Sequence, residues 1–328
     1  NQRGHLQFIA NLPFDGLSLL KRNVSDLSVE FIEDEFWLEL KRHNSSITAL
    51  NRFSSFRQML QFCVKKRQLE INVCTLAEIK RPNRKAVWDR KVKKAVAKVN
   101  PDNLQLILDR VAPQHQLKVL FALETGLRIG EQVAVKIYDP KKPEIGGIDF
   151  ENNVVHVEQA LKKGDTHATN FIGDPKSLKG IRQVPITPAL SLKLKEYWME
   201  LPIKMKAERW LFPTTHGTIG CGSNWRERIL YPACEKAGLP RDEWPRWHDL
   251  RHAFATTYLN NRGNNWVRAT ELMGHANIQT TMIYKHHVED SERDQEDAKA
   301  VSGGLRLKIN SPAAVPEDTT VVKLVAKS

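Results

Sequence analysis

Apolar residues recur every three or four positions through most of residues 26–70. Such spacing places side chains on one face of a helix. One stripe lies in SVEFIEDEFWLELK and a second in ITALNRFSSFRQMLQFCVKKRQL, where Ser45 or Ser46 provides an N-cap. We therefore predict a small helical domain over residues 25–80, after a short N-terminal segment at 1–24. The stripes consist of Phe31, Phe36, Trp37 and Leu40, then Ile47, Leu50, Phe53, Met59, Leu60 and Val64.

A second domain is predicted over residues 100–290. An Asn-Pro-Asp sequence at Asn100 opens a helix, and Gly126 separates two helical pieces in QLKVLFALETGLRIGEQVAV. VVHV and QVPI, further on, alternate and are rich in β-branched residues, as strands are. The polar stretch between them indicates an extended hairpin or loop, and helical patterns return after Pro188. The expected fold class is mainly α with a small antiparallel sheet (α+β), in two domains.

The two ends of the chain carry weaker patterns. Residues 291–328 form a C-terminal tail that is poor in core-forming residues except in VVKLV. Two interpretations stay open: this apolar segment docks on a neighbouring copy of the chain, or the tail is a disordered terminus. The chain begins with Asn1 rather than methionine, which is consistent with trimming at that end.

Composition favours a soluble protein, which we expect in the cytoplasm. Hydrophobic residues make up 41% of the chain and charged residues 27%, and no apolar run approaches the roughly 20 residues of a membrane helix. The N-terminus lacks the basic and apolar regions of a signal peptide. The four cysteines form no C-x-x-C pair, so we expect reduced thiols and no metal site built from them.

The net charge of +12 favours a polyanionic partner. Residues 80–98 hold nine Lys or Arg and one Asp, within a linker predicted at 81–99. A basic run of this kind either follows a phosphate backbone or is simply a solvated face. The candidates for DNA contact are Arg81, Arg84, Lys85, Arg90, Lys91, Lys93 and Lys94.

Three separate patches carry chemistry. TGLRIGE places Arg128 and Glu131 one helical turn apart, and WHDLRH does the same for His248 and Arg251. In LMGHANIQTTMIYKH, His275 stands nine residues before Tyr284. Each patch alone has a structural interpretation, as an ion pair, a core histidine or an exposed tyrosine.

Together, these residue types are the ones that phosphodiester transfer without a metal requires. Guanidinium groups bind phosphate oxygens through paired hydrogen bonds and stabilise the charge of the transition state. A phenol with a pKa of about 10 needs help to lose its proton, for example from a histidine. A lysine is then needed to protonate the departing oxygen.

The order R…K…H-x-x-R…H…Y resembles the catalytic domain of the tyrosine recombinases, the phage-integrase and Xer-like family. The resemblance covers roughly residues 100–290, and a weaker one to the helical core-binding domain covers 25–85. It implies a C-shaped clamp around DNA. It also implies that Arg128 and Arg251 hold the scissile phosphate, that His248 assists proton transfer, and that Tyr284 attacks to give a 3′-phosphotyrosyl link. His275 would bind a phosphate oxygen, and Glu131 would brace Arg128 and His248.

The lysine is assigned through the same resemblance. In the family it lies on a β-hairpin ahead of a strand that ends like Val-Pro-Ile. PKSLKGIRQVPI therefore nominates Lys176, with Lys179 as the second choice. The hairpin region is longer here than is usual for the family.

The resemblance further implies double-stranded DNA as the substrate, a homotetramer on two paired sites, and service to a mobile element through integration or excision. Directionality or bending factors are further expected partners, and no metal, ATP or other cofactor is expected. Two alternatives stay open: a type IB topoisomerase-like enzyme and a non-catalytic DNA-binding protein. Zinc hydrolysis is a weaker third, because His248 and His252 have the spacing of H-E-x-x-H but enclose Asp249 and Arg251.

Overall fold

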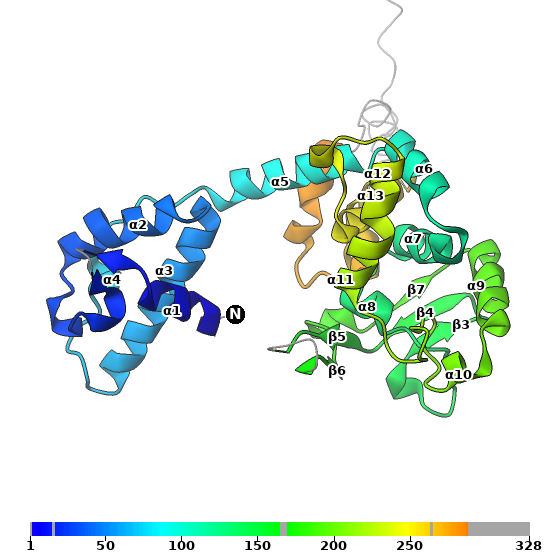
Figure 1. The fold of residues 1–328 in the computed structure, drawn as a ribbon, viewed down its shortest axis with the longest axis horizontal. Coiled ribbons are helices and arrows are strands. Elements are labelled where there is room, and N and C mark those ends of the chain that lie inside the picture. Colours follow the sequence, from blue (N-terminus) through cyan, green and yellow to red (C-terminus); the bar gives the residue numbers. More distant parts are fainter. Residues whose placement is uncertain (1, 15–16, 165–168, 263–264, 288–328) are drawn as a thin grey trace, which may run out of the picture. The chain divides into compact units, whose positions relative to one another are not determined.

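The computed structural model describes residues 2–14, 17–164, 169–262 and 265–287 (Figure 1). The tail predicted at 291–328 lies outside the described residues, and so does its VVKLV segment. Among the described residues, no helix is long and apolar enough to cross a membrane.

The N-terminal helices enclose an aromatic core. Phe36 lies 4.7 Å from Phe56 and 6.3 Å from Phe53 between ring centroids. Ser45 caps the longest helix by accepting a hydrogen bond from the backbone N–H of Thr48. The helices predicted over 26–70 are thus present, and the core also takes in residues nearer the N-terminus, such as Ile9. The elements are α1 (Gln2–Ala10), β1 (Pro13–Phe14), β2 (Leu17–Ser18), 3-10 turns at Leu19–Lys21 and Val24–Asp26, a π-helical turn at Phe31–Phe36, α2 (Trp37–Arg42), α3 (Ser46–Lys65) and α4 (Val73–Leu76).

The basic segment is helical. α5 (Arg84–Lys98) is capped by the side chain of Asn83, which accepts from a backbone N–H of the first turn. Val92 and Ala95 are buried where α5 packs on α13 (Trp247–Asn261) and on the 3-10 helix η10 (Met282–His287). One face of the helix therefore belongs to the core of the second domain.

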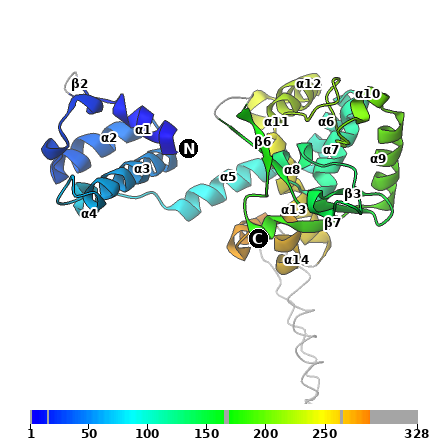
Figure 2. The same cartoon turned by 90° about the horizontal axis from the view of Figure 1, so that it is seen from below.

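The second domain is mainly helical with small antiparallel sheets, as predicted. β4 (Val154–Val157) pairs with β3 (Gly147–Asp149) on one side and β7 (Arg182–Pro185) on the other. β5 (Ala160–Lys162) and β6 (Phe171–Gly173) form a separate two-stranded pair. Both views show β6 apart from β3 and β7 (Figures 1 and 2). The extended hairpin predicted between the two strands is this pair.

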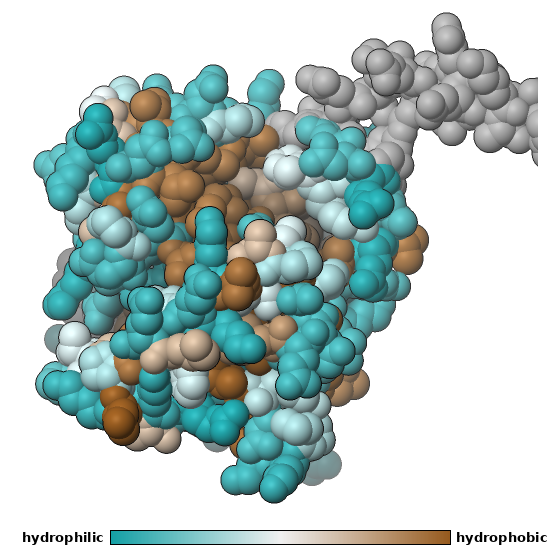
Figure 3. All heavy atoms as spheres, turned by 90° about the vertical axis from the view of Figure 1, so that its right-hand side faces the viewer, coloured by the Kyte–Doolittle hydropathy of each residue, from teal (hydrophilic) through white to brown (hydrophobic). Residues whose placement is uncertain are grey.

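Helices surround these strands, and most of them contribute residues to one apolar cluster with β3, β4 and β7. They are α6 (Pro101–Arg110), α7 (Pro113–Thr125), α8 (Ile129–Val133), α9 (Pro188–Glu200), α10 (Ile203–Lys206), α11 (Gly222–Trp225), α12 (Tyr231–Lys236), α13 and α14 (Trp266–Met273). Shorter turns lie at η4 (Pro143–Ile145), η6 (Leu178–Gly180), η7 (Arg226–Leu230), η8 (Arg241–Glu243) and η9 (Ile278–Thr280). Figure 3 views the side that carries α9 and shows apolar side chains gathered in a hollow.

Lys118 of α7 is a buried charge in the apolar core. It is 8% exposed, and its Nζ lies 3.2 Å from Nδ1 of His115 and 5.6 Å from the ring centre of Trp225. Burial lowers the pKa of Lys118 to about 8. Desolvation of the ammonium therefore opposes folding at neutral pH.

We expect Lys118→Met to raise the free energy of unfolding by about 2–3 kcal/mol near neutral pH. Below the folded pKa of about 8, Lys118 is charged in both states, so the full cost of desolvation applies. As the pH rises towards the unfolded value of about 10.5, the folded wild type loses its proton and the advantage of the variant shrinks. Urea denaturation near pH 7 and near pH 10 measures this, with exposed Lys193→Met as the control. An equal difference at both pH values would contradict the interpretation.

Candidate active site

The turn between α7 and α8 presents Arg128. Gly126 ends α7 with a φ of 59°, in the left-handed region. A Cβ at this position would lie 2.3 Å from Cδ1 of Phe254, so both the backbone angle and the close contact require glycine. Gly126 thus turns the chain and places Arg128 as the residue that precedes α8.

Glu131 holds Arg128 through both carboxylate oxygens. Its Oε1 accepts from Nη1 of Arg128 at 2.7 Å, and its Oε2 accepts from the backbone N–H of Arg128 at 2.9 Å. Oε2 also accepts from Nη2 of Arg182 at 2.9 Å. Burial acts to raise the pKa of Glu131, but the charges of Arg182 and then Arg128 hold that pKa below its ordinary value. The carboxylate is therefore ionised between two guanidinium groups.

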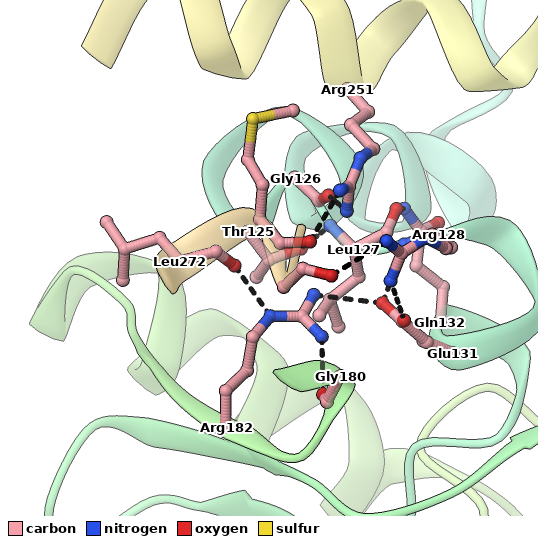
Figure 4. Close-up of polar contacts among 12 residues, drawn as sticks. Thr125, Gly126, Leu127, Arg128, Glu131, Gln132, Gly180, Arg182, Arg251 and Leu272 are labelled. Carbon is pink, nitrogen blue, oxygen red and sulfur yellow. Dashed lines mark hydrogen bonds and ion pairs between the residues drawn. The ribbon is translucent and has the colours of Figure 1, made fainter. Parts of the chain in front are cut away.

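Three arginines converge on the C-terminal end of α14, and each donates to a different carbonyl (Figure 4). Nε of Arg182, Nη2 of Arg251 and Nη2 of Arg128 are the donors. Their acceptors are the successive carbonyl oxygens of Leu272, Met273 and Gly274. The last carbonyls of a helix have no partner inside the helix and carry its negative partial charge, so they suit cations.

Arg251 is the most enclosed of the three. The residue is 2% exposed, and its Nη1 also donates to the carbonyl of Gly126 at 2.6 Å. The side chain of Arg128 is 27% exposed. The predicted pair Arg128 and Arg251 is thus brought together by α8, α13 and α14, with Arg128 the more open to an incoming anion.

His275 directly follows this helix end. Its Nδ1 lies 2.8 Å from Oγ1 of Thr281, whose hydroxyl also accepts from Thr270 at 2.8 Å. Burial, followed by the positive charges of Arg251 and Arg128, lowers the pKa of His275 to about 3. The ring is therefore neutral at physiological pH and can offer one N–H and one lone pair.

Tyr284 lies in η10 and is 1% exposed. Its hydroxyl is 2.6 Å from Nδ1 of His252 on α13. Burial raises the pKa of Tyr284 and lowers that of His252 to about 4, so both groups are neutral at rest. Asp249 lies 4.0 Å from Nε2 of the same imidazole. The phenol thus faces a neutral imidazole that can accept its proton.

His248, the second residue of α13, lies beside this pair. Its ring centre is 5.1 Å from that of His252, and the residue is exposed. Partial desolvation and the charge of Arg251 lower the pKa of His248. The imidazole in contact with Tyr284 is therefore that of His252, which the sequence interpretation treated only as half of a zinc motif.

Lys176 and Lys179 are both exposed, between β6 and β7. Lys179 lines a groove together with Arg182 and His275, whereas Lys176 is not among the residues that line it. Among the described residues, neither ammonium group donates to Glu131 or to the carbonyl oxygens that the arginines contact. The choice between the two lysines stays a prediction.

The predicted DNA contacts lie on and before α5. Arg81, Arg90, Lys91, Lys93 and Lys94 are exposed. For Arg84 and Lys85 the structure describes the helical backbone and not the side chains. The exposed cations therefore stay candidates for phosphate contact.

Sequence reasoning missed two residues of this site. Arg182 stands in IRQVPI, three positions before a proline, and no local pattern marks it as part of a charge cluster. His252 was visible one turn after His248 on the same predicted helix. The three-carbonyl arrangement was not visible, because it depends on how α14 meets α8 and β7.

Among the described residues, no group of three His, Cys, Asp or Glu side chains is placed to hold a metal ion. His252, half of the alternative zinc motif, uses Nδ1 for Tyr284. The site instead combines guanidinium groups, neutral imidazoles and a phenol. This is the set of side chains that phosphoryl transfer through a tyrosine uses.

Comparison with known proteins agrees with this class. Residues 97–291, more than half of the chain, match the phage integrase family. The chain belongs to this family, as the resemblance predicted.

Two curated relatives illustrate how much of each chain the similarity covers. A "Tyrosine recombinase XerC-like" protein of Caldanaerobacter subterraneus subsp. tengcongensis is 29% identical over 265 residues, 75% of this chain and 63% of that protein. The "Transposase from transposon Tn916" of Enterococcus faecalis is 28% identical over 186 residues, 55% of this chain and 44% of that protein. The chain thus spans from less than half to nearly two thirds of the length of these relatives.

The fold is shared with solved structures. The Tn1549 transposon integrase in complex with transposon right end DNA gives a TM-score of 0.66 at 20% identity, over 92% of each chain. The XerH site-specific recombinase bound to a palindromic difH substrate gives 0.58 at 19% identity, over 86% of this chain and 74% of that chain. At these identities the likeness shows the fold.

We expect Glu131→Gln to lower the free energy of unfolding by about 3 kcal/mol at neutral pH, because two guanidinium groups lose their shared anion. The folded pKa of Glu131 lies below its unfolded value, so the stabilising effect is complete above the unfolded pKa. It is lost as the pH falls through the folded pKa.

Urea denaturation at neutral and acidic pH measures this effect. Glu271→Gln is the matched control, because Glu271 pairs with Arg268 at an exposed site. Equal stability of Glu131→Gln and the control at neutral pH would be inconsistent with the shared-anion interpretation.

Proposed function

We propose that this protein is a site-specific DNA recombinase that cleaves and rejoins strands through a 3′-phosphotyrosyl intermediate, without metal or ATP. The hydrogen bond between Tyr284 and His252 carries the proposal. It sets a phenol against a proton acceptor one residue from Arg251, on the helix that also presents His248.

In the proposed reaction, Arg128 and Arg251 bind the non-bridging oxygens of the scissile phosphate. Oη of Tyr284 forms a bond to phosphorus while the bond from phosphorus to the 5′-oxygen breaks. The phenolic proton leaves to an imidazole, and a lysine, Lys176 or Lys179, protonates the 5′-oxygen. The bond count is conserved, so a 5′-hydroxyl from another strand reverses the step and rejoins DNA.

His252 is the proposed first acceptor of the phenolic proton. Its pKa of about 4 keeps it neutral, and its Nδ1 already contacts the hydroxyl. His248, which is exposed, is left to contact the phosphate and to pass the proton on. His275 would donate its N–H to a phosphate oxygen, and Glu131 would orient Arg128.

DNA is the proposed substrate, bound partly through α5. Exposed Lys and Arg side chains on that helix would neutralise phosphates and release counterions, so binding should weaken steeply with salt. A C-shaped clamp and a homotetramer on two paired sites are proposed from the family. The similarity to transposon proteins supports service to a mobile element, with directionality or bending factors as further partners.

One experiment tests the proposal most directly. The protein is incubated with a library of duplexes that are nicked so that cleavage releases a short fragment and traps the covalent complex. Sequencing the trapped DNA identifies the core site, and mass spectrometry identifies the modified residue. Cleavage that requires added metal, or a covalent link to a residue other than Tyr284, would reject it.

We expect Tyr284→Phe to abolish the covalent DNA complex while leaving DNA affinity nearly unchanged, because only the nucleophilic oxygen is removed. Electrophoresis under denaturing conditions measures the complex, and a mobility shift measures binding. Tyr258→Phe on α13 is the matched control and should cleave normally. A non-catalytic binding protein would show no covalent complex even as the wild type. A type IB topoisomerase would relax supercoiled DNA without a second recombination site.

We expect His252→Gln to slow single-turnover cleavage by about 100-fold, because glutamine keeps a hydrogen bond to the phenol but cannot take its proton. His216→Gln, at an exposed position, serves as the control. Cleavage by His252→Gln at the wild-type rate would assign the proton transfer to another group.

A further inference from the structure

Arg182 is held by three separate elements. It is the first residue of β7, and its side chain is 6% exposed. Nε donates to the carbonyl of Leu272 at 2.6 Å and Nη1 to the carbonyl of Gly180 at 2.8 Å, while Nη2 donates to Oε2 of Glu131 at 2.9 Å (Figure 4). The acceptors belong to α14, η6 and α8. Each nitrogen of the guanidinium group thus fixes a different part of the site.

Through its contact with Glu131, Arg182 is linked to Arg128. Glu131 shares its carboxylate between the two arginines, so the position of Arg182 sets the orientation of the group that holds Arg128. Arg128 is more exposed than Arg251, with which it is proposed to bind the phosphate. A change at Arg182 is therefore transmitted to the phosphate site through one carboxylate.

The contact with Gly180 ties Arg182 to the lysine loop, which is the segment 174–181 between β6 and β7 that carries Lys176 and Lys179. Gly180 ends η6, directly after Lys179, and is buried. A Cβ on Gly180 would lie 2.4 Å from Cβ of Pro175, so the segment that carries both candidate lysines folds back tightly on itself. By binding the carbonyl of Gly180, Arg182 anchors the end of this segment against α14.

Arg182 itself is poorly placed to bind DNA. All three of its nitrogens, Nε, Nη1 and Nη2, donate to protein oxygens, which commits the guanidinium group to contacts within the protein. Lysine could not replace it, because a single ammonium group cannot reach three acceptors that lie in the plane of a guanidinium group. Its geometry is that of a group that positions others.

We propose that Arg182 is a positioning residue for the reaction. It holds the lysine loop and the Glu131–Arg128 pair in fixed positions relative to each other at the end of α14. The inference rests on the proposed function, since it concerns the residues that act on the phosphate and on the leaving oxygen. It predicts that removing Arg182 has two separable effects. One is on the binding of the phosphate by Arg128, and the other is on the protonation of the leaving oxygen by the lysine.

The test compares Arg182→Lys and Arg182→Gln with the wild type on the core site recovered by covalent trapping. One substrate carries the normal phosphodiester, and the other carries sulfur in place of the bridging 5′-oxygen. A thiolate leaves without protonation, so the sulfur substrate does not depend on the lysine. Arg268→Lys, an exposed arginine of α14 paired with Glu271, is the matched control.

For both Arg182 variants we expect single-turnover cleavage of the normal substrate to fall by about 100-fold, as a displacement of about 1 Å would cause. With the sulfur substrate we expect the loss to shrink to about tenfold, because only the effect on Arg128 remains. DNA affinity should change little, and Arg268→Lys should match the wild type on both substrates. Cleavage of the sulfur substrate also shows that a variant is folded.

Three results would overturn the proposal. They are wild-type rates with both substrates, an equal loss with both substrates, and loss of the folded state in both variants, which would make the role of Arg182 purely structural. Failure of the wild type itself to form a covalent complex would instead reject the proposed function.

Discussion

The carbonyl end of α14 is the feature on which the site depends. Three guanidinium groups in a small volume repel one another, and burial makes that repulsion stronger. Successive carbonyls and the carboxylate of Glu131 offset it, since each arginine finds at least one oxygen acceptor. The cluster keeps an excess of positive charge around Arg128, where the side chain is still open to an anion.

Burial sets the protonation states of the neighbouring histidine and tyrosine, and the charge of the cluster adds to its effect on the histidine. Burial, followed by the positive charge of the arginines, lowers the pKa of His275 and keeps it neutral, so it can donate to an oxygen without adding another cation. Tyr284 is buried against His252, where its pKa is raised and its proton has a ready acceptor. In the resting site a protonated phenol therefore lies beside a neutral imidazole, close to the positive charge of Arg251.

The basic helix α5 combines a buried apolar face with exposed cations. One face contributes Val92 and Ala95 to the core of the catalytic domain, and cationic side chains stand on the exposed surface. A helix can serve both purposes, because its period places core and surface residues on different faces. The sequence alone does not say which way the basic residues of 80–98 face. Packing of Val92 and Ala95 decides it, because it turns the cations of α5 to the surface.

The sequence by itself determined the helices within residues 26–70, many helices of the second domain, the strands around Val155 and Val184, and the three patches that contain Arg128, Arg251 and Tyr284, but not the helices α1 and α5. Local spacing controls helix faces, turns and N-caps, so these features are encoded in short segments. Only the tertiary structure decided that Arg182 joins the cluster and that His252, rather than His248, contacts the phenol. Those pairings join residues far apart in the chain, and packing between elements fixes them where no local pattern does.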